Sequence, residues 1–195
     1  GAILSDQAYQ WLTNFYNLVE DGAGWPKTMT NARLAFLSKD PENPLAYRLL
    51  TILPNTYRRW ASIRLQSLAG WATGWGLQEI YAGIGSNGAE DAWTDVSTLF
   101  EQLQLEGTPF TGGATDLVKC FDQVDRQLLY HMLETAGMPN NVLQPYIQYM
   151  DDLLIHNSAA GGVGRPYHRR CGIPQGCPLS MLLIAALLRP WAHMV

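Results

Sequence analysis

The chain has 195 residues, of which 47% are hydrophobic and 15% are charged, and this composition is typical of one sizeable or two small globular domains. Fibrous and disordered proteins are excluded. The longest apolar run, residues 181–188, is far shorter than the ~20 residues of a membrane-spanning helix, so we expect no membrane partner. The three cysteines lack the spacing of zinc ligands or of a disulfide framework, which indicates a reducing compartment.

Charge is segregated along the chain, although the net charge is only −4. Residues 48–75 and residues 153–195 each contain four arginines and no acid, whereas residues 76–152 contain twelve acids, one lysine and one arginine. Two basic segments around an acidic one suit a site where carboxylates hold a metal and arginines hold phosphate. The same pattern is equally typical of solvated faces on different helices.

The first half of the chain predicts a mixed α/β (α+β) fold. Apolar residues at helical spacing predict a helix over residues 9–19, ended by the glycine-containing segment 21–26. Two short apolar segments, 34–37 and 49–53, predict the two strands of a hairpin-like unit, and the second strand should end at Pro54.

Two further helices follow in the prediction. The first covers residues 57–75, with aromatic residues recurring on one face. The second starts at Asn87, because Glu90 three residues later is typical of a helix start. Its buried stripe is predicted to contain Ala92, Trp93, Val96, Phe100 and Leu103.

The second half of the chain predicts a strand over residues 112–117, so that Asp116 lies at a strand end. Asp122 is predicted to cap a helix with a buried face of Val124, Leu128, Met132 and Ala136. The next helix begins near Asn141, and its buried face contains Tyr146, Ile147, Met150 and Leu154. An apolar helix is expected over residues 181–188.

Two sequence blocks in this region resemble blocks of reverse transcriptases. Thr115-Asp-Leu-Val-Lys-Cys-Phe-Asp122 resembles their Asp-x-x-x-Ala-Phe-Asp block, and Gly172-Ile-Pro-Gln-Gly-Cys-Pro-Leu-Ser180 is similar to their Pro-Gln-Gly block. The order of the blocks and the 59 residues from Asp116 to Gln175 match the non-LTR retrotransposon and group II intron branches. The resemblance covers about residues 25–195, because Lys39, Arg48, 53–58 and 83–93 resemble upstream blocks of the family.

The resemblance implies the fingers and part of the palm of a right-hand RNA-directed DNA polymerase, with helices packed on a small, mostly antiparallel sheet. Residues 1–30 are then a helical lead-in, residues 31–107 a fingers-like region and residues 108–195 a partial palm. The aromatic-x-Asp-Asp block that follows Pro-Gln-Gly in the family is missing before Val195. We therefore expect a fragment of a longer polypeptide, inactive by itself.

The implied reaction is nucleotidyl transfer from a dNTP to a primer 3′ hydroxyl, with RNA as template and DNA as primer. This chemistry uses two Mg²⁺ ions, and Mg²⁺ takes only one or two protein carboxylates together with substrate phosphates. By the resemblance, Asp116 is the catalytic carboxylate and holds the metal together with the backbone carbonyl of Leu117. The second set of carboxylates is expected outside this chain.

The resemblance also implies four nucleotide-binding side chains. Phe121 would lie under the sugar and exclude a 2′ hydroxyl, and Gln175 would touch the incoming nucleotide. Lys39 and Arg48 would hold the triphosphate, since Lys supplies a point charge and Arg a bidentate fork.

Each of these residues also has an ordinary structural interpretation. Asp116 could cap a helix or form an ion pair, and Phe121 could belong to the core. Lys39, Arg48 and Gln175 could be solvated turn or strand-end residues. At the level of the whole chain, the alternatives to a retroelement polymerase are a non-catalytic remnant that binds RNA or an RNA–DNA hybrid, and an unrelated acidic scaffold whose motifs match by chance.

The segment Tyr149-Met-Asp-Asp152 spells the catalytic hairpin signature of the family, yet we expect it to be a decoy. It precedes the Pro-Gln-Gly block instead of following it. The apolar residues around it also recur at helical spacing, which places Asp151 and Asp152 near the end of a helix and not in a tight strand-turn-strand.

Overall fold

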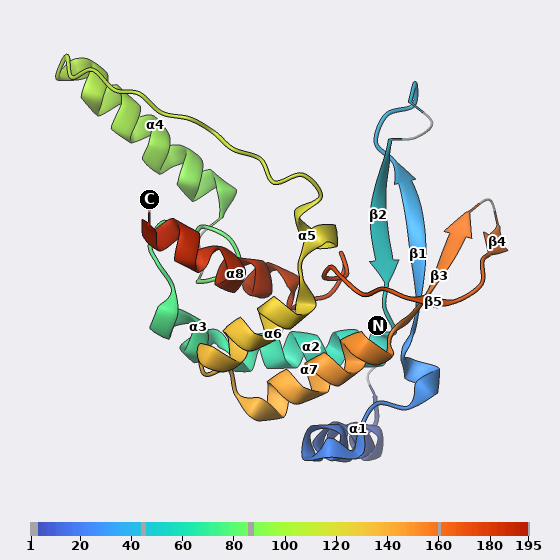
Figure 1. Ribbon diagram of the computed structural model, residues 1–195. Coiled ribbons are helices and arrows are strands. Elements are labelled where there is room, and N and C mark those ends of the chain that lie inside the picture. Colours follow the sequence, from blue (N-terminus) through green and yellow to red (C-terminus); the bar gives the residue numbers. More distant parts are fainter. Residues whose placement is uncertain (1–3, 44–45, 86–87, 160, 195) are drawn as a thin grey trace.

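The computed structural model describes residues 4–43, 46–85, 88–159 and 161–194. It shows a small sheet beside a body of helices, with one helix, α4 (Ala89–Leu105), extending away from that body (Figure 1). The other helices are α1 (Asp6–Leu18), α2 (Asn55–Ser67), α3 (Ala69–Trp75), α5 (Cys120–Gln123), α6 (Arg126–Thr135), α7 (Asn140–Asp152) and α8 (Ser180–Met194), with a π-helical turn η1 (Val19–Ala23) and a 3-10 turn η2 (Lys27–Met29).

The sheet is built around two neighbouring strands, β1 (Asn31–Ser38) and β3 (Leu154–Ala159), which pair in parallel. The other described pairings are antiparallel: β2 (Tyr47–Ile52) pairs with β1, and both β4 (Gly162–Val163) and β5 (Tyr167–His168) pair with β3. The expected hairpin and the mostly antiparallel sheet are therefore confirmed.

Alternation of side chains explains how β1 faces the helices. Ala32 and Leu34 are buried, whereas Arg33 between them is exposed, as the period of two in a strand requires. After β2, the buried Leu53 and the proline Pro54 lead directly into α2. β2 thus ends at Ile52, two residues before the predicted end at Pro54.

The predicted helix over residues 57–75 is divided into α2 and α3 at the buried residue Leu68. Ser67 donates a hydrogen bond from its hydroxyl to the carbonyl of Arg64 (2.8 Å), and such a bond competes with the helical hydrogen-bond pattern. The break allows α2 to bury Tyr57 and Trp60 while α3 buries Ala72.

An aromatic cluster forms the centre of the core and joins α2 to α7. The rings of Tyr57 and Tyr149 are stacked with their centroids 3.6 Å apart. Trp25 packs edge-on against both of them and against Trp60. The Trp25 indole N–H also donates to the carbonyl of Pro145 (3.0 Å), so that the cluster has fixed polar contacts as well as buried area.

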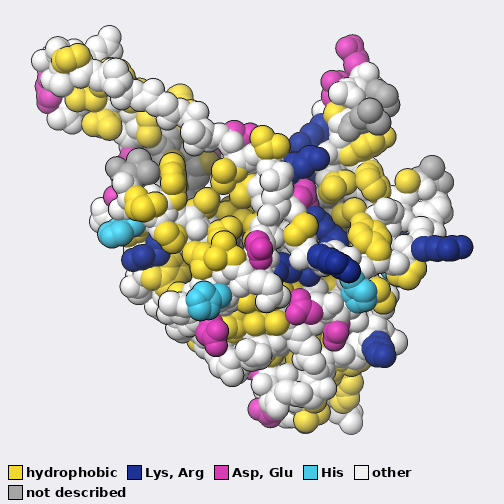
Figure 2. All heavy atoms as spheres, in the orientation of Figure 1, with side chains coloured by type: hydrophobic (Ala, Val, Ile, Leu, Met, Phe, Trp, Pro, Cys, Tyr) yellow, Lys and Arg dark blue, Asp and Glu magenta, His cyan; other side chains and the backbone are white. Residues whose placement is uncertain are grey.

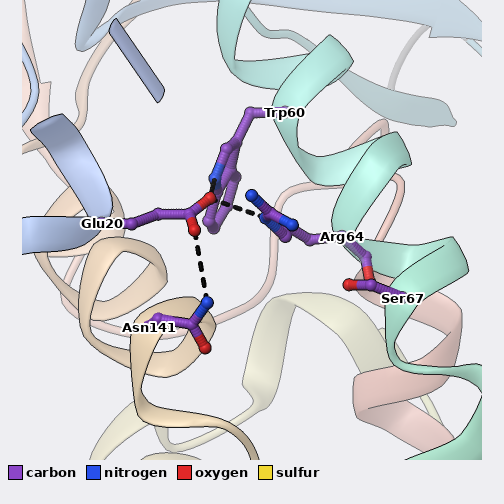
Figure 3. Close-up of polar contacts among 5 residues, drawn as sticks. All are labelled: Glu20, Trp60, Arg64, Ser67 and Asn141. Atoms are coloured by element: carbon purple, nitrogen blue, oxygen red, sulfur yellow. Dashed lines mark hydrogen bonds and ion pairs between the residues drawn. The ribbon is translucent and has the colours of Figure 1, made fainter. Parts of the chain in front are cut away.

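Glu20 in η1 accepts hydrogen bonds from side chains of α2 and α7 at the edge of this cluster (Figure 3). Its Oε1 atom accepts hydrogen bonds from Nε1 of Trp60 (2.7 Å) and Nε of Arg64 (2.6 Å) on α2. Its Oε2 atom accepts from Nδ2 of Asn141 on α7 (3.3 Å). The Glu20 side chain is only 8% exposed, and these contacts compensate for the loss of its hydration.

The structure corrects three expectations about the second half of the chain. Residues 112–117 are irregular and exposed and form no strand. Asp125, and not Asp122, caps α6, because its carboxylate accepts from the N–H groups of Gln127 and Leu128. The buried face of α6 consequently contains Leu129, Tyr130 and Leu133, while the expected Leu128 is exposed and Met132 and Ala136 are not buried.

The structure also corrects the expected stripe on α4, which contains no buried side chain. No other described element covers this helix closely enough to bury it, so the stripe of residues 92–103 remains at the surface. Asn87, the predicted start of this helix, lies outside the described residues.

The predicted helices over residues 141–154 and 181–188 are present as α7 and α8. α7 ends at Asp152, and Leu154 belongs to β3 instead of the helical stripe. Among the described helices, none has the length and hydropathy needed to cross a bilayer.

Candidate functional site

A cavity of about 360 Å³ lies between the β1–β2 hairpin and α5. The hairpin contributes five residues, and the segments that carry the two sequence blocks contribute three: Phe36, Lys39, Tyr47, Arg48 and Leu49, and Lys119, Asp122 and Gln175. Lysine and arginine side chains gather in this part of the surface, between the base of the hairpin and the helical body (Figure 2). We call this cavity the hairpin pocket.

The hairpin pocket brings together Lys39, Arg48 and Gln175, three of the residues that the sequence marks for nucleotide binding. Lys39 is held at the end of β1 because its N–H donates to the carbonyl of Ala46 (2.8 Å), which continues the ladder of the hairpin. Arg48 on β2 lies opposite Leu37 on β1. Because Lys39 comes two residues after Leu37, this register places Lys39 and Arg48 on the same face of the hairpin.

Gln175 reaches the pocket because its segment is hydrogen-bonded on both sides. Its carbonyl accepts from the N–H of Thr51 on β2 (2.8 Å), and the N–H of Ile173 donates to the carbonyl of Phe121 (2.7 Å). Gly172 allows a close approach to α5, since a Cβ atom there would lie 2.8 Å from the carbonyl oxygen of Asp122.

A buried arginine holds the Pro-Gln-Gly segment in place through hydrogen bonds. Arg126 is 5% exposed, and its Nε donates to the carbonyl of Gly172 (2.9 Å) while its Nη1 donates to that of Met150 (2.8 Å). These charge-assisted hydrogen bonds join the C-terminal end of α7 to the Pro-Gln-Gly segment.

Two residues that the sequence analysis did not assign to the site, Lys119 and Asp122, also line the pocket. The Asp122 carboxylate forms an ion pair with Nη2 of Arg169 (2.9 Å) and accepts from Nε2 of Gln175 (3.4 Å). A signal was present in the sequence, because Asp122 is the last residue of the block that contains Asp116, and Arg169 lies three residues before Gly172.

Lys119 has an unusual backbone conformation. Its φ of 51° makes it the one non-glycine residue with positive φ in the described ranges. This left-handed conformation is unfavourable for a residue with a Cβ atom and is enriched at functional sites. Here it starts α5 and brings the lysine to the wall of the pocket.

Asp116, Leu117 and Phe121 are not among the residues that line the hairpin pocket. Asp116 and Leu117 are exposed on the irregular segment before α5, and the expected strand-end position of Asp116 is not present. Asp116 lies near Cys120, since burial and the charge of Asp116 both raise the pKa of the Cys120 thiol. Phe121 is half-buried and packs against the hydrophobic core.

The donor atoms for a metal are sparse in the described part of the chain. No group of three or more His, Cys, Asp or Glu side chains is close enough there to hold an ion. Asp116 offers one exposed carboxylate and Leu117 one carbonyl, and oxygen ligands of this kind suit a Mg²⁺ ion that takes its remaining ligands from water and phosphates.

The electrostatics of the hairpin pocket favour an anion. Lys39, Arg48 and Lys119 form no ion pair with a carboxylate in the described ranges, and the one acid of the pocket, Asp122, is paired with Arg169. Three cations around one cavity attract phosphate groups, because Arg can bind phosphate through two parallel hydrogen bonds and Lys supplies a compact charge.

The segment Tyr149–Asp152 does not line the hairpin pocket. It forms the last turn of α7, with Tyr149 in the aromatic cluster and Asp151 accepting a hydrogen bond from the hydroxyl of Tyr130 (3.2 Å). Burial, followed by the charge of Asp151, raises the pKa of Tyr130. The helical conformation predicted for the expected decoy is confirmed.

The chain matches no protein-family model and no curated protein sequence.

Proposed function

We propose that the hairpin pocket binds the triphosphate of a dNTP and that the chain is the fingers and partial palm of a retroelement RNA-directed DNA polymerase. The observation that carries this proposal is the convergence of Lys39, Arg48 and Gln175 on one cavity. These residues are separated by up to 136 positions in the sequence, and the resemblance to reverse transcriptases singles them out independently of their positions in space.

The arginine and the two lysines of the pocket have different tasks in this proposal. Arg48 binds two phosphate oxygens at once, whereas Lys39 and Lys119 neutralise the remaining charge. The unfavourable backbone of Lys119 supports a binding role, because such strain persists where the surrounding structure positions a functional side chain. Gln175, which donates to Asp122, is positioned to contact the nucleotide next to the phosphates.

The proposed catalytic residue is Asp116, which would hold Mg²⁺ together with the carbonyl of Leu117. When bound, Mg²⁺ supplies neutralisation of charge on the attacking and leaving oxygens. Phe121, which directly precedes the pocket residue Asp122, is proposed to exclude nucleotides with a 2′ hydroxyl by steric contact, which is a repulsive route to specificity. The template and primer are then RNA and DNA.

Nucleotide binding by the 195-residue chain tests the pocket directly. We expect Arg48→Ala and Lys119→Asn each to weaken binding of Mg²⁺-dATP by about tenfold or more, as removal of a charge-assisted hydrogen bond costs about 1.5–3 kcal/mol. Asn tolerates the left-handed backbone, so the second variant changes the charge without disturbing the fold. Isothermal titration calorimetry gives the dissociation constants.

The matched control is Arg33→Ala, which removes an exposed arginine of β1 outside the pocket. Equal dATP affinity for Arg48→Ala and the unsubstituted chain would contradict the triphosphate site. Binding of an RNA–DNA hybrid without any binding of dATP would instead indicate the non-catalytic remnant.

Catalysis is tested in a longer polypeptide that contains this chain and extends primers. There, Asp116→Asn should abolish extension while hybrid binding stays nearly unchanged, because the substitution removes a metal ligand and leaves the basic surface intact. Extension at the unsubstituted rate would exclude Asp116 as the catalytic carboxylate.

A further inference from the structure

The exposed side of α4 is an apolar surface that the rest of the described chain covers only in part, since Phe110 stacks on Phe100 with ring centroids 4.9 Å apart and leaves both rings about half exposed. Trp93, Val96, Leu99 and Phe100 are spaced by three, three and one residues along the helix and therefore share one face. Their side chains are 75%, 45%, 51% and 46% exposed. An isolated apolar side chain at the surface is common, whereas a contiguous patch of this kind marks an interaction site. We call these four residues the α4 face.

The α4 face is surrounded by negative charge. The helix and the residue after it carry five acids, Glu90, Asp91, Asp95, Glu101 and Glu106, and the sequence contains no lysine or arginine from residue 65 to residue 118. Two α4 faces would repel each other, because like charges would be brought together as water is excluded. A suitable partner surface is consequently both apolar and basic.

A surface with these properties lies on the same molecule, between α1 and α2. This groove has a volume of about 480 Å³ and is lined by the apolar side chains of Tyr9, Leu12 and Ile63 and by the guanidinium groups of Arg58 and Arg59, among others. Tyr9 and Ile63 are 46% and 44% exposed. We call it the α1–α2 groove.

The two arginines of the groove are available to a partner. Neither Arg58 nor Arg59 forms an ion pair with a carboxylate in the described part of the chain. The positive charge of Arg59 acts on Tyr16 at the base of the groove, where it opposes the effect of burial, which raises the pKa of that tyrosine. The groove therefore combines apolar walls with unneutralised positive charge.

The α4 face cannot bind the α1–α2 groove of its own molecule. α4 extends from one end of the molecule, and α1 lies at the opposite end with the helical body between them (Figure 1). We propose that the α4 face of one copy binds the α1–α2 groove of a second copy, so that the chain associates head to tail. The inference does not depend on the proposed polymerase function.

This arrangement follows a common mode of recognition, in which an amphipathic helix lays its apolar face into a groove. Trp93 is the expected anchor, since tryptophan is enriched among the few residues that carry most of the binding energy of an interface. The contact is heterologous, because the two copies contribute different surfaces, and each dimer retains one free α4 face and one free groove. Larger assemblies should therefore form as the concentration rises.

Sedimentation velocity over a range of concentrations of the 195-residue chain tests the proposal. We expect Trp93→Ser, and separately Arg58→Glu/Arg59→Glu, to weaken self-association by about tenfold or more. The controls are Trp191→Ser, which removes another exposed tryptophan, and Arg33→Glu/Arg165→Glu, which reverses two exposed arginines elsewhere. All substituted side chains are exposed, and circular dichroism verifies that the variants are folded.

Mixing the two defective variants separates head-to-tail association from all symmetric contacts. The Trp93→Ser variant retains an intact groove, and the Arg58→Glu/Arg59→Glu variant retains an intact α4 face. At concentrations where each variant alone is monomeric, an equimolar mixture should form one-to-one dimers that do not grow further. Association should also weaken as salt is raised from about 0.05 M to about 0.5 M, because ion pairs across the contact are screened.

Three outcomes for the unsubstituted chain and the two variants would overturn the proposal. They are a monomeric unsubstituted chain at all concentrations, self-association that survives the reversal of Arg58 and Arg59, and a mixture of the two variants that remains monomeric. Loss of association in the Trp191→Ser control would also overturn it, because the contact would then lie on α8.

Discussion

The Pro-Gln-Gly segment shows how single residues determine the shape of the hairpin pocket. Gly176 has a φ of 121°, and a Cβ atom at this position would lie 2.6 Å from the carbonyl oxygen of Thr51. The N–H of the same Thr51 donates to the carbonyl of Gln175. A glycine is therefore needed for the segment to pass close to β2 and to keep Gln175 in the pocket.

Gly176→Ala should lower both stability and nucleotide binding. The added methyl group collides with the carbonyl oxygen of Thr51, and the φ that the fold requires here is unfavourable for alanine, which together cost about 1–3 kcal/mol of unfolding free energy. Urea denaturation measures this loss, and dATP titration measures the accompanying fall in affinity. The matched control is Gly74→Ala in α3, where a Cβ atom has nothing within 4 Å. Unchanged stability of Gly176→Ala would mean that the segment can move away from β2.

At the scale of elements, α7 explains why a catalytic signature can be present without a catalytic hairpin. Val142, Tyr146 and Tyr149 are buried on one face of α7, and Asp151 and Asp152 form its exposed C-terminal end. The partial negative charge at a helix C-terminus is unfavourable for carboxylates. The two aspartates consequently weaken α7 slightly.

Asp152→Asn should raise the free energy of unfolding by about 0.3–1 kcal/mol, because it removes a charge that opposes the helix dipole. Urea denaturation at low salt measures the change. A lower stability of this variant would show that Asp152 makes a stabilising contact. In a longer polypeptide that extends primers, the double variant Asp151→Asn/Asp152→Asn should remain active, whereas a loss as complete as that of Asp116→Asn would make these aspartates the metal ligands.

At the scale of the whole molecule, the core contains several groups that must stay protonated. Burial raises the pKa of the Cys177 thiol to about 11, and burial is also the largest cause of the raised pKa values of Tyr57, Tyr146 and Tyr149. The Tyr57 hydroxyl and the Cys177 sulfur are hydrogen-bonded to each other (3.2 Å). Ionisation of any of these groups would place an unpaired charge in the aromatic core.

Stability should therefore fall in alkaline solution. Between the ordinary pKa of a thiol and about pH 11, the unfolded chain releases the Cys177 proton while the folded chain retains it. The unfolded state then binds fewer protons, so the free energy of unfolding decreases with pH, by on the order of 3 kcal/mol from this thiol alone. Below this range the contribution is fully present.

Urea denaturation at several pH values between about 8 and about 11 measures this slope. Cys177→Ala should reduce the slope, whereas Cys171→Ala should not, because Cys171 is exposed. A constant free energy of unfolding across the range would contradict the protonated core. The buried tyrosines add to this loss of stability at the upper end of the pH range, since the ordinary pKa of tyrosine is higher than that of a thiol.

The sequence by itself determined the elements whose patterns are local. Two short apolar segments predicted the β1–β2 hairpin, helical spacing predicted α7 and an apolar run predicted α8, because each of these signals lies within a few residues. The resemblance to reverse transcriptases also singled out Lys39, Arg48 and Gln175 as nucleotide-binding candidates. The predicted strand over residues 112–117 was wrong, because a strand needs a neighbouring strand to hydrogen-bond with, and local spacing does not show whether one is present.

Only the tertiary structure decided which residues meet and which faces are covered. The pocket positions of Lys119 and Asp122 depend on the left-handed turn before α5 and on the pairing of Asp122 with Arg169. The apolar stripe of α4 was readable from the sequence, yet its exposure was not. Periodicity shows that a helix has an apolar face, whereas coverage of that face depends on elements distant in the chain.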